Sequence, residues 1–248
     1  MLNLTSSSVT VNCFYVSSGT CSETGYTVSL TPNQPVSWMA STGANGSGTR
    51  LAPPFTGDGE LTCVVVPLGF ADLQSYNALQ GRALVSDSSG QTIGYSAIAF
   101  QRLSAGSFTG EISLDGVTYE QCPDRLHFHV LTNQATSNSE FVLIPCSQDL
   151  LNQLPSGASV QLSVINEFEQ RFSGATSVTC FNRFSFSSIS TLRQSSVGTD
   201  TVHVIVRGTD VPLIGLVIDG FTTSGGMASA SSNDPDLEGG RSATIYLP

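Results

Sequence analysis

Short runs in which apolar and polar residues alternate cover most of the chain, a pattern that predicts β-strands with one buried and one exposed face. Gly, Pro, Asn and Ser, which favour turns, bound these runs. One run, 61–66, is continuously apolar and β-branched, which predicts a central strand buried on both faces. The predicted strands are 9–16, 26–30, 36–40, 61–66, 83–86, 92–100, 126–131, 140–144, 159–165, 177–181, 201–206, 213–218 and 243–247.

Other segments lack this alternation. The segment 147–154 predicts one short helix, because it begins with a serine suited to an N-cap, has apolar residues at helical spacing and is followed by Pro155. Residues 41–59 are rich in Gly, Pro, Ser and Thr and predict a long exposed loop. Residues 87–90 predict a hairpin turn, and the Gly/Ser/Ala-rich residues 222–232 predict a mobile tether before the last strand.

The two halves of the chain match each other weakly. Each half contains a similar succession of strands, with a cysteine in the second strand of the series (Cys63 and Cys180). We therefore predict an all-β fold of two tandem β-sandwich units, 1–105 and 110–248, near the roughly 100 residues usual for such domains. Immunoglobulin-like and jelly-roll-like topologies both fit this pattern, and one larger sandwich is the alternative.

The composition excludes several classes of protein. Only 11% of the 248 residues are charged, against about 25% in typical domains, and the net charge is −10. All basic side chains are arginines, since the chain contains no lysine. A chain with this negative net charge and few basic residues lacks the positively charged surface that binds nucleic acid or anionic lipid. Ser, Thr, Val and Gly are abundant in the chain and are poor helix formers. This composition disfavours a helical bundle.

The cysteines indicate the compartment. Six of them in an acidic, Ser/Thr/Gly-rich chain favour disulfides and an oxidising environment, and no Cys-x-x-Cys pair supports a zinc ribbon or a thioredoxin-like site. The sequence leaves the pairing open. If the two halves correspond, the matched positions are Cys21 with Cys63 and Cys146 with Cys180, which leaves Cys13 and Cys122.

The start of the chain and the absence of a long apolar run also bear on location. The opening Met-Leu-Asn-Leu-Thr has no basic and no apolar leader region, which predicts a mature secreted form whose signal peptide has been removed. No run approaches the roughly 20 apolar residues of a membrane helix. We expect an extracellular or cell-surface protein without a transmembrane segment.

Four segments support this expectation by resemblance. Residues 11–16, 30–36, 145–151 and 166–173 resemble parts of uncharacterised secreted or cell-surface proteins of environmental bacteria. The string Asn-Glu-Phe-Glu-Gln-Arg-Phe-Ser at 166–173 is the most specific of them. The resemblance covers most of the chain and implies an extracellular β-rich protein, but it implies no activity.

The histidines are the first candidate site. His127 and His129 are two residues apart in a predicted strand and therefore share one face, and His203 lies in another strand of the same half. Three imidazoles can hold zinc or copper if the two strands are adjacent, and Asp124 and Glu140 are nearby carboxylates. The alternative is that the histidine face lies toward solvent.

Carboxylates supply two further candidates. Glu167, Glu169 and Arg171 would share one side of an extended segment, where they form a surface ion network or fix the contact between the two domains. As the alternative, Glu167 and Glu169 are a glycosidic acid and base. Acidic residues at alternate positions near the C-terminus could bind calcium, although ordinary turns have the same composition. These are Asp234, Asp236 and Glu238.

Two further features have both a structural and a binding interpretation. Trp38, with Tyr15, Tyr26 and Phe55, could form a platform for carbohydrate, or could belong to the core. The last strand, 243–247, could pair with a neighbouring molecule or close its own sheet.

No strong catalytic constellation occurs in the sequence, which lacks a Gly-x-Ser-x-Gly elbow. We therefore predict no enzyme and no catalytic residue. The leading hypothesis is a secreted or cell-surface structural protein that contacts other proteins, with self-assembly into a surface layer, matrix or filament as one form. Uncharged Ser/Thr surfaces favour this hypothesis because they cost little to desolvate. The alternatives are a metal-binding extracellular protein or enzyme using the histidines, and a carbohydrate-binding module.

Overall fold

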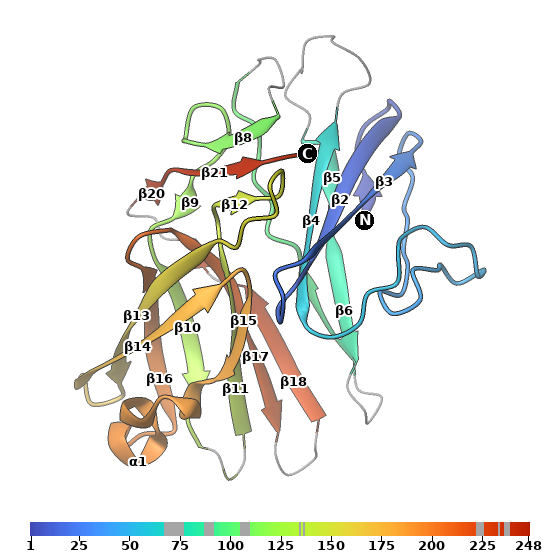
Figure 1. The fold of residues 1–248 in the computed structure, drawn as a ribbon. Coiled ribbons are helices and arrows are strands. Elements are labelled where there is room, and N and C mark those ends of the chain that lie inside the picture. Colours follow the sequence, from blue (N-terminus) through green and yellow to red (C-terminus); the bar gives the residue numbers. More distant parts are fainter. Residues whose placement is uncertain are drawn as a thin grey trace.

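A computed structural model shows a mostly-β chain with several antiparallel sheets and one short α-helix (Figure 1). It describes residues 1–66, 77–86, 92–104, 110–133, 135, 137–221, 226–232, 234–235 and 239–248. The short 3-10 turns η1 (Phe186–Ser188) and η2 (Ser190–Leu192) lead into the helix, α1 (Gln194–Val197).

The largest sheet has five strands, all antiparallel to their neighbours. Its order is β14 (Arg171–Thr179), β13 (Gly157–Asn166), β16 (Thr201–Gly208), β10 (Leu126–Leu131) and β19 (Asp234–Pro235). Buried and exposed residues alternate strictly through most of β13. One face of this sheet is therefore buried and the other faces solvent.

A second sheet has four strands, and it supplies the other side of the main core. Its order is β15 (Asn182–Ser185), β11 (Ser137–Pro145), β17 (Leu213–Phe221) and β18 (Gly226–Ser232). The β18 strand extends this sheet where the composition of 222–232 predicted a mobile tether, because 226–232 pairs with β17.

The inner faces of these two sheets share one hydrophobic cluster. Val164 of β13 and Val204 of β16 meet Phe141 of β11 and Val217 of β17 in it, and all four side chains are fully buried. Burial of apolar surface is the main favourable term in folding, so this cluster holds the two sheets together.

The N-terminal region forms a three-stranded sheet in which β2 (Val9–Ser17) lies between β3 (Glu23–Leu30) and β4 (Gly59–Val66). The prediction that 61–66 is buried on both faces is wrong, since Leu61 is 43% exposed and 62–66 are only half-buried. Among described strands β4 pairs with β2 alone, so it is an edge strand.

A hairpin of the first half packs on the second half. Strands β6 (Arg82–Ser86) and β7 (Thr92–Ser96) pair as predicted, and the turn predicted at 87–90 lies outside the described residues. Ile93 of β7 joins Val142 and Leu216 in a cluster on the outer side of the four-stranded sheet. The remaining strands are β1 (Leu2–Asn3), β5 (Leu79–Gln80), β8 (Glu111–Leu114), β9 (Cys122–Pro123), β12 (Gln148–Asp149), β20 (Gly240–Arg241) and β21 (Ala243–Tyr246).

Residues from both sides of the predicted domain boundary share another cluster, in which Phe14 and Val16 of β2 pack with Leu114 and Leu150. A disulfide between Cys21 and Cys180 and a buried hydrogen bond join the same regions. Residues 105–109 of the predicted boundary lie outside the described residues. The division into 1–105 and 110–248 stays a prediction.

The predicted helix at 147–154 is wrong. Gln148 and Asp149 form β12, which runs parallel to β21, and the N–H groups of Leu150 and Leu151 donate to the carbonyl of Tyr246. The carboxylate of Asp149 then accepts from Asn152, which closes a turn. Pairing with the C-terminal strand therefore replaces the local helical preference.

Other local expectations have mixed outcomes. Residues 36–40 form no strand, because the N–H of Met39 bonds back to Ala44 in a loop. The predicted loop 41–59 is confirmed apart from an isolated bridge between Ala44 and Arg50 and the first residue of β4. The last strand closes its own sheet, because β21 pairs with β8 and β12.

The disulfide pairing expected from the matched halves is also wrong. The bonds are Cys13–Cys63, Cys21–Cys180 and Cys122–Cys146. The expectation failed because the halves do not pair alike: β13 pairs with both β14 and β16, whereas its supposed counterpart at 36–40 is not a strand. Three disulfides are consistent with an oxidising compartment.

Candidate functional site

Beyond Arg171, which is exposed at the start of β14, the exposed face of the β13–β14 hairpin consists of uncharged side chains. Three pairs lie directly opposite each other across the two strands: Ser159 with Ser177, Gln161 with Ala175, and Ser163 with Ser173. All six residues are exposed, and so is Thr179 at the end of β14. We call these seven residues the uncharged face: Ser159, Gln161, Ser163, Ser173, Ala175, Ser177 and Thr179.

Side chains from other segments cap the outer edge of this hairpin. The hydroxyl of Thr191 donates to the carbonyl of Ser173, and the amide of Asn182 donates to the carbonyl of Ser177. An open edge strand is a template for pairing with another chain, and such caps remove its free acceptors. The face of the hairpin is therefore more available to a partner than its edge.

The tip of the hairpin is held in a fixed shape by Asn166. Its side-chain oxygen accepts from the N–H groups of Phe168 and Gln170, and its amide nitrogen donates to the carbonyl of Val197 and to the side chain of Gln170. Glu169 has a positive φ of 61°, in the left-handed region. Phe168 is 71% exposed on this turn.

The predicted cluster of Glu167, Glu169 and Arg171 does not form. All three are described, and no ion pair joins them. The reason is local geometry, because 167–170 is a hairpin turn and not an extended segment. The carboxylate of Glu167 instead accepts from the N–H and the hydroxyl of Thr201, at 3.2 and 2.7 Å.

The histidines do come together. As the metal hypothesis requires, β10 and β16 are adjacent, and His129 lies directly opposite His203. Nδ1 of His127 is 3.1 Å from Nε2 of His203, and their rings are nearly parallel with centroids 5.2 Å apart. These rings lie on the outer face, because the alternate residues Phe128 and Val204 are buried in the core.

The environment favours neutral histidine at this position. Partial burial lowers the pKa of His203, and the charges that His127 and His129 can carry lower it further. Within the part of the chain that the structure describes, no group of three or more His, Cys, Asp or Glu is placed to hold a metal ion.

The two nearby carboxylates are engaged elsewhere. Asp124 is 3.1 Å from the guanidinium of Arg207 and 3.6 Å from those of Arg125 and Arg241. Glu140 accepts from Arg183 at 2.6 Å. Neither carboxylate therefore faces the histidines as a free ligand.

Two of the three residues of the calcium hypothesis lie outside the described part of the chain. Asp236 and Glu238 lie outside the described residues. Asp234 belongs to β19, where its backbone pairs opposite His127. The calcium site stays a prediction.

The predicted aromatic group forms a packed cluster. The indole N–H of Trp38 donates to the hydroxyl of Tyr15 at 2.7 Å, and the Tyr15 ring stacks on Phe55 and Tyr26 with centroids 4.7 and 5.3 Å apart. Tyr15 is buried, and the other three are half-buried. Both the carbohydrate interpretation and the core interpretation of this cluster stay predictions.

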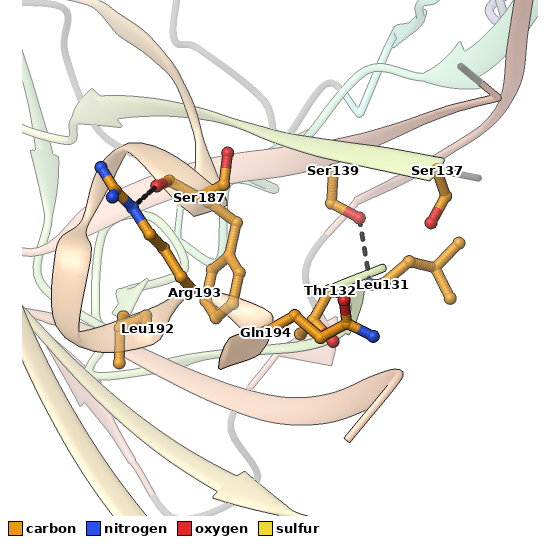
Figure 2. A pocket seen from close by; sticks show the side chains of 9 residues that line it. Leu131, Thr132, Ser137, Ser139, Ser187, Leu192, Arg193 and Gln194 are labelled. Atoms are coloured by element: carbon orange, nitrogen blue, oxygen red, sulfur yellow. Dashed lines mark hydrogen bonds between the residues drawn. The ribbon is translucent and has the colours of Figure 1, made fainter. Parts of the chain in front are cut away.

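Two of the surface depressions in the described part of the chain are shallow. Figure 2 shows one between the end of β10, the start of β11 and the helical turns, where Ser139 accepts from the N–H of Leu131 and Arg193 donates to the carbonyl of Ser187. Its side chains leave no room for a water molecule. The other, beside the Cys21–Cys180 disulfide, has a volume of about 20 Å³, enough for one water.

Sequence interpretation missed the uncharged face, although its signal is present. Serines alternate with apolar residues in 157–166, and small residues alternate in 171–179, with a short polar turn between the two segments. Reading the two segments as one hairpin would have placed these residues opposite each other.

The chain matches no known protein-family model, and no curated protein and no solved structure is significantly similar to it. The resemblance to secreted bacterial proteins therefore stays a prediction. None of the helices in the described ranges is long and apolar enough to cross a membrane.

Proposed function

We propose that this chain is a secreted or cell-surface structural protein, and that it assembles with a second copy through the uncharged face. Its two larger sheets, packed as a β-sandwich, serve as the scaffold that presents this face. The observation that carries the proposal is the face itself: seven exposed residues on two paired strands, none of them charged.

The chemistry of the face suits close protein contact. Ser and Ala lose little side-chain entropy on burial, and their short side chains leave the sheet surface flat. None of the seven residues carries a charge that has to be desolvated, and desolvation of charges is a major cost of association. Interface cores are depleted in charged residues for this reason.

The uncharged face permits a second copy as the partner in spite of the charge of the chain. The chain carries a net charge of −10, so two copies repel each other over most of their surfaces. The uncharged face is a region where two copies can meet without placing like charges in contact. A basic partner would find no carboxylate on this face to bind.

Sedimentation velocity over a range of protein concentrations tests the proposal. The native chain should show a reversible shift to larger species as concentration rises. Ser163→Lys and Ser177→Lys each place a charge within the face and should weaken association by more than about tenfold, or about 1.4 kcal/mol. Ser29→Lys, at an exposed position on β3, is the matched control and should assemble like the native chain.

A native chain that stays monomeric at every concentration would contradict the proposal. So would Ser163→Lys and Ser29→Lys variants that assemble equally well. Far-UV circular dichroism of each variant separates a loss of association from a loss of folding.

A further inference from the structure

All three histidines of the chain lie on one face of the five-stranded sheet, beside the uncharged face but not part of it. We propose that His127 and His203 form a binding site for a transition-metal ion of the zinc class, with His129 as an adjacent third imidazole. This site is independent of the proposed assembly, because none of its residues belongs to the uncharged face.

The distance between the two ring nitrogens supports this site. Zinc–nitrogen bonds are about 2.0–2.1 Å long, so two imidazole nitrogens on one ion are about 2.9 Å apart at a right angle and about 3.3 Å apart at the tetrahedral angle. Nδ1 of His127 and Nε2 of His203 are 3.1 Å apart. The two nitrogens already have the separation of neighbouring ligands.

The sheet fixes the positions from which these rings project. His127 and His203 lie on paired antiparallel strands, and the residues that follow them, Phe128 and Val204, anchor both strands in the core. Ligands built on paired strands need little backbone movement to bind, and a metal site gains affinity from such preorganisation.

Nothing else in the described part of the chain competes for these two nitrogens. Their one hydrogen bond is with each other, in which one ring donates N–H and the other accepts. A metal ion would replace this bond when the donor ring moves its proton to its other nitrogen, so the net charge of the pair does not change.

The ligand set selects the class of ion. Imidazole nitrogens suit zinc, copper and nickel, whereas calcium and magnesium require oxygen ligands. Asp124 and Glu140, the nearby carboxylates, are held by arginines. His129 is opposite His203 with ring centroids 6.5 Å apart, so its imidazole lies next to the pair.

Isothermal titration calorimetry of the full chain with zinc and, separately, nickel tests the site, with magnesium as the contrasting ion. We expect saturable binding of one zinc ion per chain and no binding of magnesium. His127→Ala and His203→Ala should each weaken zinc binding by roughly tenfold or more, and His129→Ala should weaken it less. Ile205→Val changes the side chain opposite His127 without removing a nitrogen, and should bind zinc like the native chain.

Two further measurements keep the test decisive. Copper(II) should broaden the imidazole signals of His127 and His203 in the proton NMR spectrum of the native chain, without any substitution. The Ser163→Lys background, in which assembly is weakened, should bind zinc like the native chain, which separates this site from the proposed assembly. Absence of zinc binding, or equal binding by the His127→Ala and His203→Ala variants and the native chain, would overturn the proposal.

Discussion

The carboxyl group of Glu60 and the side-chain amide of Gln148 meet in a buried contact between β4 and β12. Nε2 of Gln148 donates to Oε1 of Glu60 at 2.6 Å, and the hydroxyl of Thr62 donates to the same oxygen. Oε2 of Glu60 and Oε1 of Gln148 are both buried without a hydrogen-bond partner. Both atoms are acceptors when Glu60 is ionised, so a proton on Glu60 supplies the donor that this contact lacks.

This contact predicts that Glu60 makes stability depend on pH. Burial raises the pKa of Glu60 above its usual value of 4.5, and this effect exceeds the opposing effect of the hydrogen bonds from Thr62 and Gln148. Because the folded-state pKa is raised, the stabilisation is fully present below pH 4.5 and is lost as the pH rises through the folded-state value. Each unit of difference between the folded and unfolded pKa corresponds to about 1.4 kcal/mol.

Urea unfolding from acid to neutral pH measures this dependence. The native chain should lose stability as the pH rises, and Glu60→Gln, which keeps the shape without the charge, should lose less. Glu111→Gln, at an exposed position of β8, is the matched control and should follow the native chain. Identical pH profiles for the native chain and Glu60→Gln would show that Glu60 does not carry the effect.

The strands were largely predictable because their signal is local. Val160, Leu162 and Val164 point into the core, while Gln161 and Ser163 between them face solvent. This alternation is present in the sequence of β13 itself. The pairing of β10 with β16 is not local, yet it brings the histidines together as their hypothesis required.

The wrong predictions share a different cause. In each case the structure depends on a contact with a residue far away in the sequence. The helix expected at 147–154 is replaced by contacts with Tyr246, about a hundred residues later. Cys13 bonds Cys63 because β2 pairs with β4, and no pattern within either strand specifies that neighbour. No local pattern predicts the contact of Glu60 with Gln148 either, because 88 residues separate the two in the sequence.

The Cys21–Cys180 disulfide should contribute more to stability than Cys13–Cys63. It joins residues 159 apart in sequence, whereas Cys13 and Cys63 are 50 apart and already face each other across paired strands. A longer closed loop removes more entropy from the unfolded chain. The Cys21→Ser/Cys180→Ser double variant should lose about 3–5 kcal/mol of unfolding free energy.

Chemical denaturation under non-reducing conditions compares this variant with Cys13→Ser/Cys63→Ser. Limited proteolysis should also cut the first variant faster near β2, because the disulfide ties the end of that strand to the region after β14. Equal losses of unfolding free energy in the two double variants would contradict the argument from loop length.

Asn166 should stabilise the tip of the β13–β14 hairpin. Its side chain satisfies the N–H groups of Phe168 and Gln170 and the carbonyl of Val197, and it is only 5% exposed. Asn166→Ala leaves these backbone groups without partners, and we expect a loss of about 1–3 kcal/mol. Asn152→Ala, in the exposed turn after β12, removes a similar side chain from a solvated site and should change stability by less than about 0.5 kcal/mol.

Hydrogen exchange locates the effect of Asn166 directly. In Asn166→Ala, the amides of Phe168 and Gln170 should exchange faster than in the native chain, while those in the middle of β13 should change little. Asn166→Asp keeps the oxygen that accepts from both amides but loses the donor to Val197, so its stability should fall between those of Asn166→Ala and the native chain. Unchanged exchange at Phe168 and Gln170 in Asn166→Ala would mean that the turn holds its shape without this side chain.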